Sequence, residues 1–173
     1  MEVSQNRLKQ AGIRISRAGL HNIERKLISD ENDKKIKRLT KKFDRVLVDA
    51  PCTGTGTWRR DPDTRAKYSD LDLENMMSLQ DRILASAARL TKPGGCLVYV
   101  TCSLLREENE DRIIALLSRR KDYTIVPIPK IWDEQVTVKG GGKCPTNSEM
   151  LRLTPKEHNT DGFFAAVLRR DLH

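Results

Sequence analysis

Two short apolar runs in the middle of the chain, at residues 45–48 and 96–100, predict its central strands. Both runs are rich in β-branched or aromatic residues and are too short for helices, so we expect buried parallel strands. Between them, residues 71–90 place apolar side chains at intervals that return to one helical face, which predicts an amphipathic helix. Residues 92–95, Lys-Pro-Gly-Gly, end that helix and turn the chain into the second strand. This order of strand, helix, turn and strand is typical of a right-handed crossover unit in an α/β fold.

The flanking segments predict further helices and strands. Residues 4–20 favour a helix, for which Ser4 is a suitable N-cap. Residues 107–120 also favour a helix, because acidic residues at their start and basic residues at their end suit the helix dipole. Strands are expected at residues 23–28, 123–128 and 162–168, with a weaker signal at 150–153.

Length and composition limit the choice of fold and partner. A chain of 173 residues can bury one sizeable core, so we expect a single domain over residues 1–173. The net charge of +8 and a pI near 9.5 favour a polyanionic partner such as RNA or DNA. Aromatic residues make up only 5% of the chain, which argues against a surface that stacks on bases.

The cysteine pattern indicates the compartment. There are four cysteines, but neither a signal peptide nor an apolar run of the about 20 residues that a membrane span needs. We therefore expect a cytoplasmic protein with reduced thiols and no membrane association. A metal site is not expected, because no Cys-x-x-Cys occurs and the three histidines are scattered along the chain.

Two of these cysteines, Cys52 and Cys102, each follow the end of a predicted strand. Reacting groups in open α/β sheets gather at the carboxyl ends of strands, so we expect both thiols at one edge of the sheet. A thiol is a good nucleophile once its surroundings favour the thiolate. Cys102 precedes a predicted helix, and the positive end of the helix dipole favours a thiolate there. Asp49 ends the first strand and is a candidate for binding a base or a cofactor. Two structural alternatives stay open: Cys102 as a small buried residue and Asp49 as a loop cap.

Several motifs, spread over residues 43–168, match one known family. They are Asp49-Ala50-Pro51-Cys52-Thr53-Gly54-Thr55-Gly56, Arg59-Arg60-x-Pro62-Asp63, Leu79-Gln80, Lys92-Pro93-Gly94-Gly95, Tyr99-x-Thr101-Cys102-Ser103 with Glu107-Glu108-Asn109, and Arg152-Leu153-x-Pro155-x-x-His158-x-Thr160-Asp161-Gly162-Phe163-Phe164-Ala165. Together they resemble the Sun-type RNA (cytosine-5) methyltransferases. The resemblance implies an α/β fold, a Rossmann-like sheet with flanking helices, and S-adenosylmethionine as cofactor.

By this resemblance, Cys102 is the nucleophile that attacks carbon 6 of a cytosine in RNA, with ribosomal RNA as the expected substrate. Carbon 5 then receives the methyl group of S-adenosylmethionine. Cys52 matches the family's second cysteine, which assists loss of the carbon 5 proton and release of the product. Asp49 matches an acid of the cofactor and cytosine site, and Glu2 and Asp30 are further candidates for cofactor binding. The family's first strand and Gly-rich cofactor loop have no counterpart here, so we expect an N-terminally incomplete catalytic domain.

Two other functions fit parts of the sequence. A non-catalytic RNA-binding or assembly module would keep the fold without the cofactor, which the missing Gly-rich loop favours. An amino-group methyltransferase acting on nucleic acid would need a polar Asp/Asn-Pro-Pro-aromatic motif and no nucleophilic thiol. Retention of both cysteines favours the cytosine-5 enzyme over either alternative.

Overall fold

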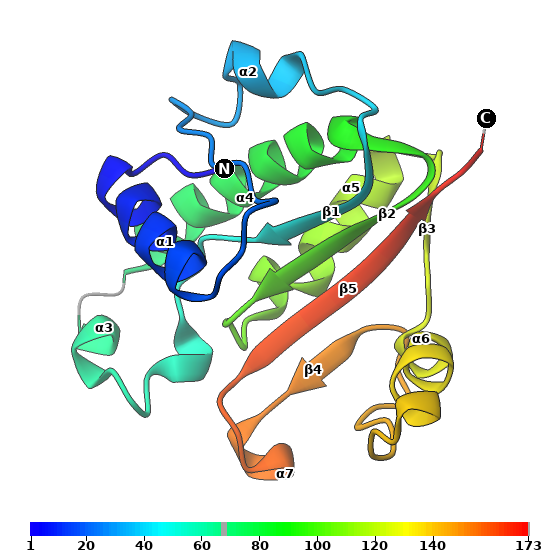
Figure 1. Cartoon of the computed structure of the whole chain (residues 1–173). Helices are drawn as coiled ribbons and strands as arrows, with labels where there is room; N and C mark the ends of the chain where they lie inside the picture. Colours follow the sequence, from blue (N-terminus) through cyan, green and yellow to red (C-terminus); the bar gives the residue numbers. More distant parts are fainter. Residues whose placement is uncertain (67–68, 173) are drawn as a thin grey trace. The chain divides into compact units, whose positions relative to one another are not determined.

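The computed structural model describes residues 1–66 and 69–172, and it divides into two compact units, residues 1–40 and 41–173 (Figure 1). The expectation of a single domain stays a prediction. The first unit contains helix α1 (Gln5–Arg17) and the short helix α2 (Lys34–Lys37). Helix α1 begins where predicted, since the Ser4 hydroxyl accepts a hydrogen bond from the Arg7 N–H at 3.4 Å.

The strand predicted at residues 23–28 is wrong. Only one isolated parallel bridge forms there, between Leu27 and Glu2. The Glu2 N–H donates to the Lys26 carbonyl at 3.1 Å, and the Ile28 N–H donates to the Glu2 carbonyl at 3.1 Å. Because α1 starts at Gln5, the partner segment is too short to extend this bridge into a ladder.

The second unit is built on a five-stranded sheet with the order β1-β2-β5-β3, to which β4 adds by pairing with β5. Strands β1 (Phe43–Asp49) and β2 (Thr91–Thr101) are parallel, which confirms the predicted crossover pair. Strand β5 (Phe163–Arg170) runs antiparallel to β2 and to β3 (Tyr123–Ile125), and β4 (Leu151–Leu153) pairs antiparallel with β5. The sheet is therefore mixed, with the last strand of the chain inserted between two earlier ones (Figure 1).

The predicted helix between β1 and β2 is confirmed as α4 (Asp70–Leu90), which contacts both strands. Helix α5 (Glu110–Arg119) lies beside α4 and follows the short 3-10 turn η2 (Arg106–Glu108). The remaining described helical segments are η1 (Thr55–Thr57), α3 (Pro62–Ala66), α6 (Ile128–Gln135), η3 (Thr137–Lys139) and α7 (Pro155–His158).

The strand expected at residues 123–128 is shorter than predicted, because β3 ends at Ile125 and α6 begins at Ile128. Pro127 caps α6 and Pro129 lies in its first turn, where a missing N–H and a fixed φ suit a helix start. Ile128, which lies between these prolines, therefore belongs to a helix that strand periodicity does not reveal.

The core lies between the sheet and α4. Leu97, Tyr99 and Phe164 of the sheet are fully buried, with Leu84 of α4 packed in the same cluster. The rings of Tyr99 and Phe164 meet edge to face, with centroids 6.3 Å apart, a favoured geometry for aromatic pairs. Burial on both faces was expected for β1, but Leu47 is 68% exposed, so only the alternate residues of β1 face the core.

The turn predicted at residues 92–95 lies within β2 rather than before it. The pairing register between β1 and β2 shifts there, from Phe43 opposite Thr91 to Arg45 opposite Cys96. Gly94 has a φ of 74°, which favours glycine, and a Cβ on Gly95 would approach the Asp44 carbonyl to 2.8 Å. The turn thus takes up the extra residues before regular parallel pairing begins.

Candidate active site

The carboxyl ends of β1 and β2 bring two distant thiols together. Asp49 pairs with Val100 at the end of the ladder, and the Ala50 N–H continues the pairing by donating to the Val100 carbonyl at 3.0 Å. Cys52 and Cys102 leave this edge, and their Sγ atoms are 3.3 Å apart. Both side chains are half-buried and reduced. A parallel strand pair thus places two residues 50 positions apart within hydrogen-bond distance.

The contact between the thiols gives them different acidities. The hydrogen bond from Cys52 lowers the pKa of Cys102 to about 7, and the N–H of Cys102 itself adds to this effect. The same contact, together with burial, raises the pKa of Cys52 far above the ordinary thiol value. Near neutral pH the pair therefore consists of a Cys102 sulfur that is close to half ionised and a Cys52 thiol that donates to it. Such an arrangement suits Cys102 as the nucleophile.

The glycine-rich loop after Cys52 lets three backbone segments approach one another. The Gly56 N–H donates to the Cys102 carbonyl at 2.9 Å, and the Gly162 N–H donates to the Gly56 carbonyl at 2.9 Å. A Cβ on Gly56 would lie 2.6 Å from Gly162 Cα and 2.7 Å from the Cys102 carbonyl oxygen. Only glycine fits there, so this residue fixes the backbone of Cys102 against the loop before β5.

Two buried polar side chains bind the residues on either side of Cys52. The Glu108 carboxylate accepts hydrogen bonds from the Thr53 N–H at 2.9 Å and from the Thr53 hydroxyl at 2.5 Å. The Gln80 amide donates to the Pro51 carbonyl at 2.9 Å and to Glu108 at 3.0 Å. Both Glu108 and Gln80 are 0% exposed. The residues on either side of Cys52 are therefore anchored to α4 and to η2.

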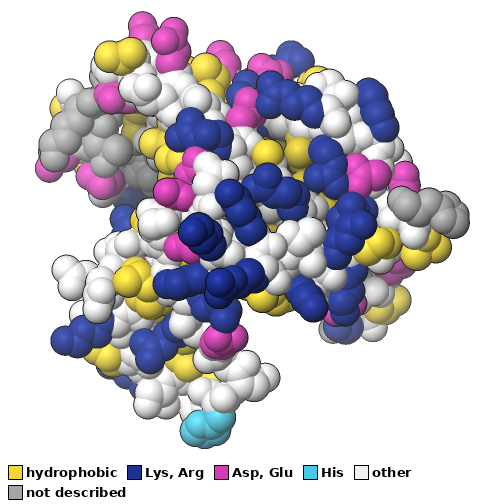
Figure 2. Space-filling view, turned by 90° about the horizontal axis from the view of Figure 1, so that it is seen from above, with side chains coloured by type: hydrophobic (Ala, Val, Ile, Leu, Met, Phe, Trp, Pro, Cys, Tyr) yellow, Lys and Arg dark blue, Asp and Glu magenta, His cyan; other side chains and the backbone are white. Residues whose placement is uncertain are grey.

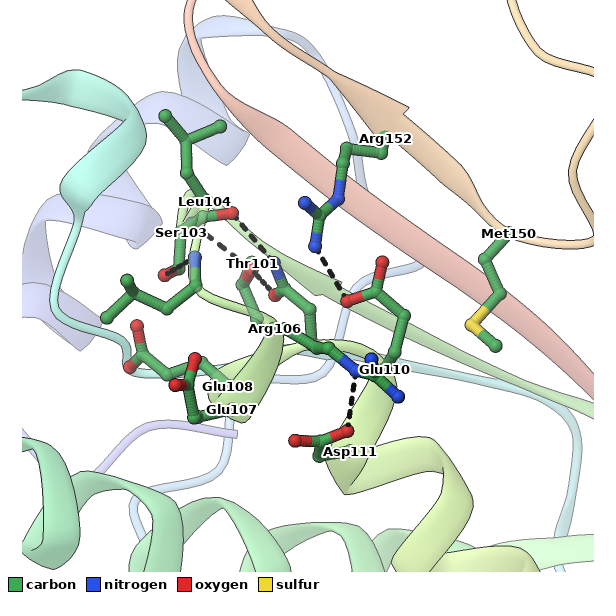
Figure 3. A network of polar contacts seen from close by, with 12 residues as sticks. Thr101, Ser103, Leu104, Arg106, Glu107, Glu108, Glu110, Asp111, Met150 and Arg152 are labelled. Carbon is green, nitrogen blue, oxygen red and sulfur yellow. Dashed lines mark hydrogen bonds and ion pairs between the residues drawn. The ribbon is translucent and has the colours of Figure 1, made fainter.

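The residues on either side of Cys102 are held by Asn109, which follows Glu108 in the chain. Its amide donates to the Ser103 carbonyl at 2.9 Å, and its carbonyl oxygen accepts from the Thr101 hydroxyl at 2.6 Å. Figure 3 shows Thr101 and Ser103 beside the start of α5, close to Glu107 and Glu108. Asn109 precedes α5 as its N-cap, yet its side chain makes no capping bond because it is engaged with this loop.

Arg152 of β4 ties the last part of the chain to the same helix. Its guanidinium donates to the Glu110 carboxylate at 2.8 Å, as Figure 3 shows. Arg106 of η2 pairs with Asp111 at 3.1 Å on the outer side of the helix start. These ion pairs involve partly exposed side chains, so they orient the helix start more than they stabilise it.

Asp49 lies at the end of β1 with an exposed side chain, and its negative charge opposes the lowering of the Cys102 pKa that the Cys52 hydrogen bond causes. No hydrogen bond or ion pair to its carboxylate is found within residues 1–66 and 69–172, so it can accept hydrogen bonds from a ligand. Glu2 and Asp30, the other cofactor candidates, belong to the first unit. The Glu2 carboxylate accepts from the N–H groups of Val3 and Ser4, and Asp30 accepts from the Asn32 N–H. The proposed roles of all these residues stay predictions.

Gln80, Glu108 and Asn109 were not predicted as site residues, although two of the matching motifs contain them. A signal for Gln80 existed, because it interrupts the apolar stripe of the helix between Met77 and Leu84. A polar residue on a core-facing stripe needs a buried partner. Glu108 and Asn109 stand at a predicted helix start, where acidic side chains and Asn are common. The sequence pattern therefore did not indicate their side-chain contacts.

The surface carries many basic side chains. Figure 2 shows Lys and Arg spread over the face that it draws, with fewer Asp and Glu among them. Within the described part of the chain, no helix is both long and apolar enough to span a membrane. The described residues also hold no group of three or more His, Cys, Asp or Glu side chains that could bind a metal ion.

Comparison with known proteins gives consistent matches. A family model described as 16S rRNA methyltransferase RsmB/F matches residues 1–169. Ribosomal RNA small subunit methyltransferase B of Shewanella oneidensis is 38% identical over 131 residues, which cover 76% of this chain and 28% of that protein. Ribosomal RNA small subunit methyltransferase F of Cronobacter sakazakii is 32% identical over 169 residues, which cover 98% of this chain and 34% of that protein. The chain thus spans about a third of the length of these relatives.

Solved structures agree on the fold. The crystal structure of NSun6 from Pyrococcus horikoshii with SFG has a TM-score of 0.75 and 29% identity, and the match covers 99% of this chain and 40% of that one. A methyltransferase homologue from the same organism has a TM-score of 0.71 and 34% identity, with 97% of this chain and 51% of that one covered. The expected fold class, a Rossmann-like methyltransferase sheet with flanking helices, is confirmed.

Proposed function

Because the chain belongs to the RsmB/F family of 16S rRNA methyltransferases, we propose that it carries the catalytic thiols of an enzyme that methylates carbon 5 of a cytosine in RNA. The observation that carries this proposal is the 3.3 Å contact between the Cys52 and Cys102 sulfurs at the carboxyl edge of the sheet. Methyl transfer to carbon 5 needs a nucleophile that first activates the ring, and a thiol of lowered pKa beside a protonated thiol meets this need.

Cys102 opens the reaction. Its thiolate forms a bond to carbon 6 of the cytosine, and the electron pair of the 5,6 double bond becomes available at carbon 5. S-adenosylmethionine, when bound, supplies an electrophilic methyl group. A water molecule then takes the proton from the methylated carbon 5. The electron pair of that C–H bond forms the 5,6 double bond again as the bond from carbon 6 to Cys102 breaks. The sulfur leaves as a thiolate with the bonding electron pair.

Cys52 acts on the sulfur of Cys102 and on the last steps. Its raised pKa keeps the thiol protonated near neutral pH, so it can donate to the Cys102 thiolate before attack. At the end of the reaction the same donor is in place to stabilise the departing thiolate. Loss of Cys52 should therefore slow release of the RNA more than formation of the bond.

The cofactor fits the residues at the strand ends. Asp49 has an exposed carboxylate without a partner among the described residues, and it ends β1 at the sheet edge from which the thiols leave, where Rossmann-like sheets bind ligands. It would accept hydrogen bonds from polar groups of S-adenosylmethionine. The family match and the likeness to a structure with SFG, an analogue of S-adenosylmethionine, support this assignment. Glu2 and Asp30 are proposed as further contacts.

RNA is the proposed substrate and partner. Ribosomal RNA is the first candidate, because the named relatives are ribosomal RNA methyltransferases. The net charge of +8 supports binding to phosphates. A base inside a duplex cannot reach a thiol at a sheet edge, so the cytosine must be unpaired or flipped out of its stack.

Nucleoside analysis of treated RNA tests this function. The full-length protein is incubated with S-adenosylmethionine and RNA, and the digested nucleosides are identified by mass spectrometry. We expect 5-methylcytidine from the wild type and from Cys144→Ala, a matched control at another free cysteine, and none from Cys102→Ala. Methylation of an exocyclic amino group would favour the amino-group methyltransferase. RNA binding without any methylated product would favour the non-catalytic module.

A further inference from the structure

Two consecutive residues, Glu108 and Asn109, hold the backbone beside Cys52 and beside Cys102, respectively. The Glu108 carboxylate binds the N–H and the hydroxyl of Thr53, next to Cys52. The Asn109 side chain binds the Ser103 carbonyl and the Thr101 hydroxyl on either side of Cys102, at 2.9 Å and 2.6 Å. One short backbone segment at the start of α5 therefore fixes both loops.

We propose that Glu108 and Asn109, with Gln80 as their support, are positioning residues that set the distance between the Cys52 and Cys102 sulfurs. The inference rests on the proposed function, because it assigns these residues to the release step that Cys52 serves. Glu108 fixes the Cys52 side of the pair, and Asn109 fixes the Cys102 side. Neither side chain touches the reacting atoms.

The placement of Glu108 and Gln80 is unfavourable for stability alone. Both side chains are 0% exposed, and no ion pair to Glu108 is found within residues 1–66 and 69–172. Gln80 Oε1 is buried and has no hydrogen-bond partner among the described residues. Burying a carboxylate and an unpaired amide oxygen costs free energy that an apolar residue at either position would avoid. Buried polar groups of this kind are typical of positions kept for function.

The geometry indicates what these residues control. Thr53 follows Cys52 directly, and the Gln80 amide binds Pro51 on the other side, at 2.9 Å. The peptide bonds on both sides of Cys52 are thus held, which leaves its thiol few positions besides the one 3.3 Å from Cys102. Without Glu108 the Thr53 anchor is lost, and Cys52 can turn away from its partner. A displacement of about 1 Å at a reacting group can reduce a rate by about 100-fold.

Cross-linking of the thiols measures this distance directly on the chain. Dibromobimane has two alkylating arms and becomes fluorescent when both have reacted with thiols. The rate of Cys52–Cys102 cross-linking is compared with single alkylation of Cys102, and mass spectrometry of peptides separates these products from those of Cys96 and Cys144. A change in this ratio reports a change in the placement of Cys52. A general loss of stability would leave the ratio unchanged as long as the protein stays folded.

The variants isolate the carboxylate of Glu108. Glu108→Ala removes its contacts, and we expect the ratio to fall about tenfold. Glu108→Gln keeps an acceptor for the Thr53 N–H and a polar atom against the hydroxyl, so it should retain most of the wild-type ratio. Glu107→Ala is the matched control, because the neighbouring Glu107 is exposed and should not affect the ratio. If Glu108→Ala fails to fold, Thr53→Val removes the hydroxyl contact from the half-buried loop side and should lower the ratio in the same direction.

Asn109 is tested in the same way from the other loop. Asn109→Ala should lower the cross-linking ratio, because Ser103 and Thr101 lose their anchor. If Glu108→Ala, Thr53→Val and Asn109→Ala all cross-link at the wild-type ratio, the positioning role is refuted.

The RNA reaction separates the two proposals. In the full-length enzyme, Glu108→Ala should accumulate a covalent protein–RNA species on unmodified RNA, as Cys52→Ala should, because a displaced Cys52 no longer assists release. If the wild-type enzyme forms no 5-methylcytidine, the proposed function fails, while the cross-linking result still decides the positioning role. If the wild type is active and Glu108→Ala releases RNA at the wild-type rate, the link between Glu108 and release is refuted.

Discussion

The acidity of Cys102 depends on its neighbour, which gives a prediction that needs no RNA. Hydrogen bonding from Cys52 is the largest cause of the lowered pKa, which is about 7. Cys52→Ala removes this donor, whereas Cys52→Ser keeps an O–H donor at the same place. We therefore expect the pKa of Cys102 to rise to about 8.5 or above in the alanine variant, as for an ordinary thiol. It should stay near the wild-type value in the serine variant.

The size of the effect follows from the ionised fraction. At pH 7 a thiol with a pKa of about 7 is roughly half ionised, and one with a pKa of about 8.5 is about 3% ionised. The thiolate population of Cys102 thus falls about 15-fold in Cys52→Ala. A more basic thiolate is about fourfold more nucleophilic, so the alkylation rate at pH 7 should fall by only about three- to fourfold. The midpoint of the pH profile, which should move upward by about 1.5 units, is therefore the clearer measurement.

The assay is alkylation of the chain by iodoacetamide between about pH 5 and 10, with the Cys102 peptide quantified by mass spectrometry. The rate rises as pH passes through the pKa, because the thiolate is the reactive form. An unchanged midpoint in Cys52→Ala would refute the view that the second thiol tunes the first. A midpoint that rises equally in the serine variant would show that the hydrogen bond is not the cause.

Three further predictions concern packing and binding. Gly56→Ala should destabilise the chain by about 1–3 kcal/mol in thermal or urea unfolding, because its Cβ would lie 2.7 Å from the Cys102 carbonyl, whereas Gly142→Ala, with open space around its Cβ, should be neutral. Leu84→Ala should cost about 2–5 kcal/mol by the same measurement, because Leu84 is 1% exposed, and the exposed Leu71→Ala should change stability by less than about 0.5 kcal/mol. RNA affinity measured by filter binding should fall about tenfold or more between about 50 and 200 mM salt, and a salt-independent affinity would contradict binding through phosphates.

The parts of the fold that depend on local pattern could be predicted. The apolar stripe of α4 and the runs in β1 and β2 are regular over their whole length, so their positions and parallel pairing were confirmed. The insertion of β5 between β2 and β3 could not be foreseen, because it depends on pairing between segments far apart in the chain. The sequence located the five strands approximately, but it also predicted a strand at residues 23–28 that does not form, and it did not indicate the order of the strands.

The candidate site also contains residues that could be predicted and residues that could not. Its two cysteines were visible because each follows a strand end, and their shared edge follows from parallel pairing. The support beneath them was not visible, because Glu108 binds Thr53 across 55 positions and Gln80 across 28. A sequence pattern indicates that a buried polar residue needs a partner, but only the packed structure shows which partner it has.

We propose that Cys102 forms the covalent bond to cytosine, and the whole mechanism depends on this bond. To test this bond, the full-length protein is incubated with S-adenosylmethionine and RNA that contains 5-fluorocytidine, where fluorine at carbon 5 blocks release. The trapped protein–RNA complex is digested, and the modified peptide is mapped by mass spectrometry. We expect RNA on the peptide that contains Cys102, and no complex with Cys102→Ala. A complex that maps to Cys52, or that persists in Cys102→Ala, would contradict it.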